Sequence, residues 1–66
     1  MRRAIMDATS LSHKYAKAQE GAKGVTNEGR KIRVLIEDCY IVVHGSRPKS
    51  AKELTRWIEH LLDMDQ

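Results

Sequence analysis

Apolar and β-branched residues are densest between Lys31 and His44, where two apolar runs are separated by Glu37-Asp38. Two strand-like runs flanking a short polar pair are typical of a β-hairpin. If Glu37-Asp38 forms the turn, alternate side chains of both runs fall on one apolar face. That face comprises Ile32, Val34, Ile36, Cys39, Ile41 and Val43. The pattern therefore predicts a hairpin with one side facing the core, although Glu-Asp lacks the glycine that two-residue hairpin turns favour.

The opposite face of this hairpin is mixed in character. Its members are Lys31, Arg33, Leu35, Tyr40, Val42 and His44. Basic groups beside an aromatic ring suit phosphate contact combined with base stacking. Alternatively, the first helix covers this face and leaves the cations at its rim.

A helix is expected on each side of the hairpin. The first runs from Asp7 or Thr9 to about Glu20, because small and apolar residues recur there at helical spacing. Its stripe is Ala8, Leu11, Tyr15, Ala18 and Ala22. The second begins at a capping box formed by Ser50 and Glu53. Its apolar arc is Ala51, Leu54, Trp57, Ile58, Leu61, Leu62 and Met64.

This element order predicts a single α+β domain over residues 1–66, a small α-β-β-α fold with both helices on one face of the sheet. Residues 21–30 form a glycine-containing linker in which Val25-Thr26 is a candidate short third strand. Open strand edges invite pairing with another chain. The fold thus predicts a homodimer or a stable hetero-complex.

Charge is distributed unevenly along the chain, whose net charge is +3. Residues 1–33 sum to +5 and residues 34–66 sum to −2. A basic segment favours an anionic partner. The single cysteine, Cys39, excludes an intramolecular disulfide. The absence of a long apolar run or an h-region favours a cytoplasmic protein that does not enter a membrane.

Residues with catalytic chemistry do not form a recognisable pattern. Glu37 and Asp38 are neighbours whose side chains point apart, and His13, His44 and His60 lie in three different elements. Neither a zinc-ligand spacing nor a nucleotide-binding loop is present. We therefore expect a non-enzymatic protein without a cofactor, a metal or a small-molecule substrate.

Basic residues cluster where the second helix begins. They are Arg47, Lys49, Lys52 and Arg56, whereas Asp63 and Asp65 lie near the other end. This arrangement opposes the helix dipole, which prefers anions at the N-terminus. The cost of misplaced charges suggests an anion site where amides, dipole and cations converge. The alternative is that solvent and salt screen these charges.

The stretch Gly45-Ser46-Arg47-Pro48-Lys49-Ser50-Ala51-Lys52, following a helix and strands, resembles the end of a double-stranded-RNA-binding domain. The resemblance implies a basic run that grips phosphates at the start of the last helix. It covers about a dozen residues. It departs at Thr55-Arg56-Trp57, where that family places small residues.

These observations favour a small basic regulatory protein that binds nucleic acid through phosphate contacts. The predicted contact residues are Lys31, Arg33, Tyr40, Arg47, Lys49, Lys52 and Arg56. The alternative is a protein-interaction module, such as an inhibitor or adaptor that docks on a larger complex, as phage and mobile-element accessory proteins do.

Overall fold

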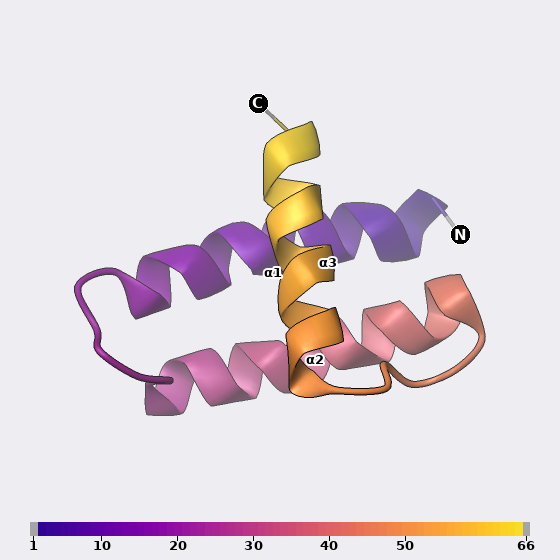
Figure 1. Cartoon of the computed structure of the whole chain (residues 1–66). Coiled ribbons are helices and arrows are strands. Elements are labelled where there is room, and N and C mark those ends of the chain that lie inside the picture. Colours follow the sequence, from indigo (N-terminus) through magenta and orange to yellow (C-terminus); the bar gives the residue numbers. More distant parts are fainter. Residues whose placement is uncertain (1, 66) are drawn as a thin grey trace.

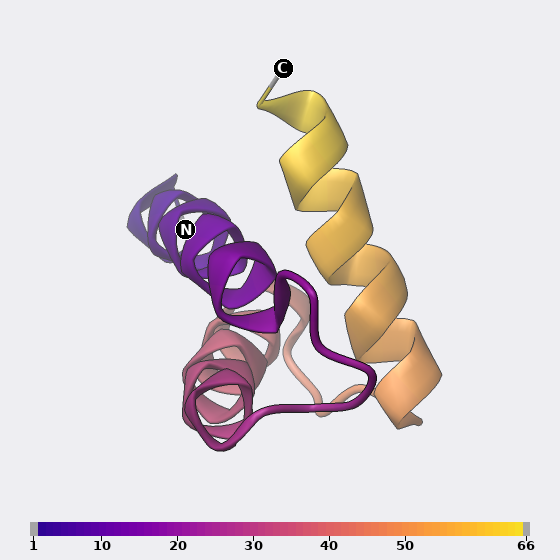
Figure 2. The ribbon, with the colours of Figure 1, turned by 90° about the vertical axis from the view of Figure 1, so that its left-hand side faces the viewer.

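The computed structural model describes the backbone of residues 2–65 and the side chains of residues 3–65. It contains three helices, α1 (Arg2–Gln19), α2 (Asn27–His44) and α3 (Ala51–Met64). The first two run antiparallel and α3 crosses both of them (Figure 1). The end-on view in Figure 2 shows α1 and α2 as one layer, with α3 packed against one side of it.

The predicted α+β fold is wrong, because no residue between positions 2 and 65 lies in a strand. The expected hairpin is the greater part of α2, and Val25-Thr26 belongs to the link before that helix. The open strand edge, the predicted route to dimerisation, therefore does not exist in the described chain. The strand order that supported the resemblance to a double-stranded-RNA-binding domain is also absent from the described chain.

Burial along α2 follows a helical period. Ile36 and Tyr40, four residues apart, are buried, and Ile32 packs beside them half-buried. Val34 is 61% exposed although the hairpin prediction placed it beside Ile36 in the core. A period of two and a period near four both fit Ile32 and Ile36, so the apolar pattern alone did not separate the two structures.

Local signals at both ends of α2 favour the helix. The Thr26 hydroxyl caps its start by accepting a hydrogen bond from the Gly29 amide at 2.9 Å. Gly45 ends it in the left-handed conformation, with φ of 80°, and its amide donates to the Ile41 carbonyl at 2.8 Å. Glycine tolerates this conformation because it has no Cβ. Residues 30–44 contain neither glycine nor proline that would break a helix.

The Gln19 side chain fixes the link between α1 and α2. Its amide nitrogen donates to the Gly24 carbonyl at 2.8 Å, and its Oε1 accepts the Thr26 amide at 2.8 Å. A Cβ at Gly29 would collide with this Oε1, so a larger residue there would displace the Gln19 side chain from these bonds. These contacts hold the end of α1 beside the start of α2.

The small residues of α1 let it lie close to its neighbours. This helix starts earlier than predicted, and Ala8 and Ser12 on its inner side are fully buried. The Ser12 hydroxyl donates to the Ala8 carbonyl at 2.7 Å, which satisfies the buried oxygen. Leu11 and Tyr15 of the predicted stripe pack against the core, whereas Ala22 lies exposed in the link.

The predicted second helix is confirmed as α3. The Ser50 hydroxyl accepts the Glu53 amide at 3.2 Å, which is one half of the capping box, whereas the Glu53 carboxylate accepts the Lys49 amide in place of that of Ser50. Leu54 and Ile58 join the core cluster, but Met64 is 62% exposed and does not belong to it. The described Cα atoms span 32 × 26 × 16 Å, so the short dimension holds only two layers of helices. None of the described helices has the length and apolarity needed to cross a membrane.

Two alanine substitutions distinguish the helix from the predicted hairpin. We expect Ile36→Ala to lower the free energy of unfolding by about 2–5 kcal/mol, since it empties a buried site. Val34→Ala should change it by less than about 0.5 kcal/mol, because that side chain is exposed. Urea unfolding of both variants measures the difference. Equal, large losses would contradict the helical register.

Candidate functional site

The start of α3 is organised by the Glu53 carboxylate. Its Oε2 accepts the Lys49 amide at 2.8 Å, and its Oε1 accepts the Tyr40 hydroxyl at 3.0 Å. The bond from the Lys49 amide, followed by that from Tyr40, lowers the pKa of Glu53 below its ordinary value. Burial, together with the bond to this carboxylate, raises the pKa of Tyr40. The carboxylate therefore stays ionised while it ties the loop to α2.

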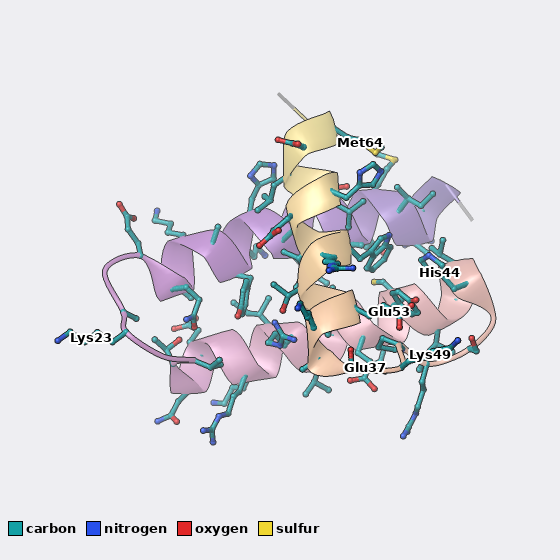
Figure 3. All side chains as sticks on the ribbon, viewed as in Figure 1. Lys23, Glu37, His44, Lys49, Glu53 and Met64 are labelled. Carbon is teal, nitrogen blue, oxygen red and sulfur yellow. The ribbon has the colours of Figure 1, made fainter. Side chains whose placement is uncertain are left out.

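Four exposed cations surround this capped helix start, and we call them the α3 basic surface. Its members are Arg47, Lys49, Lys52 and Arg56. Figure 3 shows Lys49 projecting away from the helices, at the opposite end of the molecule from Lys23. Between residues 3 and 65 the only contact of ion-pair length joins His13 Nε2 to Asp65 Oδ2, at 2.6 Å. None of the four cations lies within ion-pair distance of a carboxylate in that range, although the charge of the ionised Glu53 acts on Lys49.

Arg33 has a structural position that the sequence did not indicate. Its guanidinium donates to the Ala51 carbonyl at 3.0 Å and to the Thr55 hydroxyl at 3.1 Å, both in α3. It also lies over the Tyr15 ring of α1, at 5.6 Å from the ring centre, and reaches its hydroxyl at 3.4 Å. A guanidinium can serve several acceptors in this way because its five donors are fixed in a plane. Arg33 thus joins all three helices.

Tyr40 is likewise part of the interior. It is 6% exposed, stacks on the His44 ring at 3.9 Å between centroids, and meets Trp57 edge to face at 5.2 Å. Such pairs add to the stability gained from burial. Its ring is therefore unavailable for stacking on a base, and the predicted combination of aromatic and basic groups on one surface is absent.

Lys31 lies apart from the other predicted contact residues. It is exposed on α2 beside a shallow hollow that Glu28 and Leu35 also line. The seven predicted residues thus separate into the α3 basic surface, two interior residues and one lysine elsewhere. Only the first group forms a candidate site.

A groove beside this site was missed because its central residue, Val34, was assigned to the core. It has a volume of about 560 Å³ and lies between the α1–α2 link, α2 and the start of α3. Its lining is mostly apolar, with charged groups at the rim. The lining residues are Val25, Arg30, Arg33, Val34, Glu37, Pro48, Ser50, Ala51 and Leu54. The described side chains include no group of three or more His, Cys, Asp or Glu suited to a metal ion.

Replacing Arg33 tests its role in joining the helices. Arg33→Ala should lower the free energy of unfolding by about 1.5–3 kcal/mol, because it removes hydrogen bonds from a charged donor. Arg30→Ala is the matched control, since Arg30 is exposed one turn earlier on α2. It should change stability by less than about 0.5 kcal/mol. Similar losses in both variants by urea unfolding would contradict this role.

The lowered pKa of Glu53 gives a pH dependence of known sign. Its contribution to stability is fully present above the ordinary value of 4.5 and is lost as pH falls through the lowered value. The stability difference between the wild type and Glu53→Gln should therefore be largest near neutral pH and shrink below pH 4.5. Thermal unfolding across this range measures it, with the exposed Glu59→Gln as the control. A difference that grows on acidification would contradict the assignment.

Comparisons with known proteins leave the function to be inferred from this geometry. No protein-family model, curated protein or solved structure matches the chain. The inference therefore rests on the α3 basic surface and on the way α3 is held across the other two helices.

Proposed function

We propose that this protein is a small nucleic-acid-binding domain whose contact surface is the α3 basic surface. The observation that carries the proposal is the position of the one acid between Gly45 and Ile58. Glu53 is bonded inward to Tyr40 and to the Lys49 amide and forms no ion pair with the four cations, which outnumber its single negative charge. Exposed Lys and Arg side chains that are not held in ion pairs are the usual contacts to phosphate oxygens.

The arrangement of α3 also supports the proposal. One side of α3 packs against the α1–α2 layer (Figure 2), and its buried residues are Leu54, Ile58 and Leu61. At 3.6 residues per turn the exposed Lys52 and Arg56 lie on the opposite side of the helix. A helix that projects from a small domain in this way fits the major groove of a duplex. The N-terminal half of α3 would approach the phosphates.

The proposed ligand is a duplex and not a single strand, because single-strand binding draws on exposed aromatic platforms. The described aromatic side chains are all packed against the core: Tyr40 is buried, and Tyr15 and Trp57 are half-buried. Contact through phosphates alone is largely independent of sequence. We therefore expect weak binding, with Kd on the order of 10⁻⁴–10⁻⁶ M at physiological salt.

Salt dependence tests the proposal. Each phosphate contact releases counterions, so four cations predict that log K falls with log salt at a slope of about −3 to −4. Lys52→Ala should weaken binding and reduce the magnitude of this slope by about one. Lys23→Ala, with the same charge change in the α1–α2 link, should do neither. Fluorescence anisotropy with a labelled duplex at several salt concentrations measures the affinity and its salt slope for each variant.

The stability of the same variant separates binding from folding. Lys52 lies in the first turn of α3, where a cation opposes the helix dipole. Lys52→Ala should therefore retain or slightly raise the melting temperature while it loses affinity. Absence of binding at low salt, or equal effects of Lys52→Ala and Lys23→Ala, would overturn the proposal. Either outcome would then favour a protein-interaction module. A pull-down with this protein from nuclease-treated lysate tests that alternative, which predicts that one partner protein is retained in stoichiometric amount.

A further inference from the structure

The side of the α1–α2 layer opposite α3 is uncovered (Figure 2). We call it the open face, and it comprises Arg3, Asp7, Ser10, Lys14 and Lys17 of α1 with Glu28, Lys31, Leu35, Asp38 and Val42 of α2. All of these residues are exposed, and on each helix they recur at intervals of three and four. Such spacing forms one straight stripe along a helix. The open face is thus two parallel stripes on neighbouring helices.

Shared hollows establish which residues of the two stripes lie side by side. Arg3 lines a hollow with Val42, and Asp7 lines two hollows with Asp38. Leu35 shares hollows with Leu11 and Lys14 of α1. At the far end, Lys17 and Glu28 line one hollow together.

Charge is separated along this face. Asp7 and Asp38 lie together on one side of Leu35, where their charges, after the larger effect of burial, raise the pKa of the half-buried Cys39 thiol. Lys14 and Lys31 lie on the other side. Leu35, in the middle, is 50% exposed. The centre of the face therefore has an acidic side and a basic side divided by an exposed leucine, with Arg3 at the far end of the acidic side and Glu28 at the far end of the basic side.

The spacing of these charges is nearly symmetric. At 1.5 Å per residue, Asp38 lies about 4.5 Å beyond Leu35 along α2, and Lys31 lies about 6 Å before it. Along α1, Asp7 lies about 6 Å before Leu11, and Lys14 lies about 4.5 Å after it. A half-turn of the face about an axis through Leu35 and Leu11 would therefore exchange acidic positions for basic ones.

We propose that the open face binds a second copy of this chain across a two-fold axis. This axis lies in the plane of the face, passes Leu35 and Leu11, and runs perpendicular to the helices. In this arrangement α1 stacks antiparallel on the second α1, and α2 on the second α2. Asp38 faces Lys31 of the other copy, and Asp7 faces its Lys14. The same surface serves both subunits, as in an isologous interface.

Other occupants and orientations fit less well. A two-fold axis along the helices would place Asp7 against Asp38 and would set the lysines against one another. A uniformly charged partner would meet repulsion over half of the face. At each end of the proposed dimer, Arg3 faces Lys17 of the second copy and Val42 faces its Glu28. The Glu28 carboxylate then lies between these two cations, Arg3 and Lys17. The centre buries Leu35 and its half-buried neighbours in a four-helix stack.

A charge exchange tests the dimer. The variant Asp7→Lys/Asp38→Lys has a wholly basic open face at its centre, and Lys14→Glu/Lys31→Glu has a wholly acidic one. Each should be monomeric alone, and an equimolar mixture should form a heterodimer. Sedimentation velocity at tens of micromolar and low salt measures this, with circular dichroism as the control for folding. A strictly monomeric wild type, or a mixture that fails to pair, would overturn the proposal.

Cross-linking tests the position of the axis. In a Cys39→Ser background, the thiols introduced by Leu35→Cys would face each other across the axis and should form an intermolecular disulfide on mild oxidation. Those introduced by Val42→Cys would lie about 21 Å apart along the helices, far beyond the reach of a disulfide. Equal cross-linking at both positions would contradict the antiparallel register. Neither test depends on nucleic-acid binding.

Discussion

The Arg33 guanidinium links the third helix to the first two. Arg33 donates to the Ala51 carbonyl and the Thr55 hydroxyl of α3 while it lies over the Tyr15 ring of α1. Apolar burial is thin in a chain of 66 residues, and side chains such as Ile36 and Ile58 do not by themselves specify a crossing direction. Directional bonds from a half-buried cation supply that information. Together with the bond between Tyr40 and Glu53, this contact holds α3 in the direction that leaves Lys52 and Arg56 exposed.

The sequence predicted α3 and its cap correctly because several independent signals agreed there. Ser50 and Glu53 lie at capping-box spacing, and the apolar residues that follow fit only a helical period. The prediction failed for α2, where it gave a hairpin. Apolar residues at every second position also include every fourth position, which lies on one side of a helix. The signals that separate the two structures were Thr26 and Gly45, which cap the ends of α2. The predicted fold instead gave Thr26 to a linker with a candidate third strand and Gly45 to the loop after the hairpin.

The candidate site was predicted in part for the same reason. The cations at the start of α3 follow from a correctly placed helix, and they are exposed as expected. The inward direction of Arg33 and Tyr40 could not be read from residue type, because arginine and tyrosine occur at surfaces and in interiors alike. Only the packing of α3 over α2 turns them inward. A false hairpin placed both on the face opposite its core and so grouped them with Lys31, from which the fold separates them.

The two proposed surfaces lie on opposite sides of the α1–α2 layer, which restricts what a dimer could do. Dimeric helix-turn-helix proteins hold both recognition helices toward one side of a duplex, one helical turn apart. Here the open faces would meet in the middle, so the two α3 basic surfaces would point away from each other. They could not contact neighbouring sites on the same straight duplex. A dimer of this kind would instead hold two separate segments of nucleic acid, one on each side.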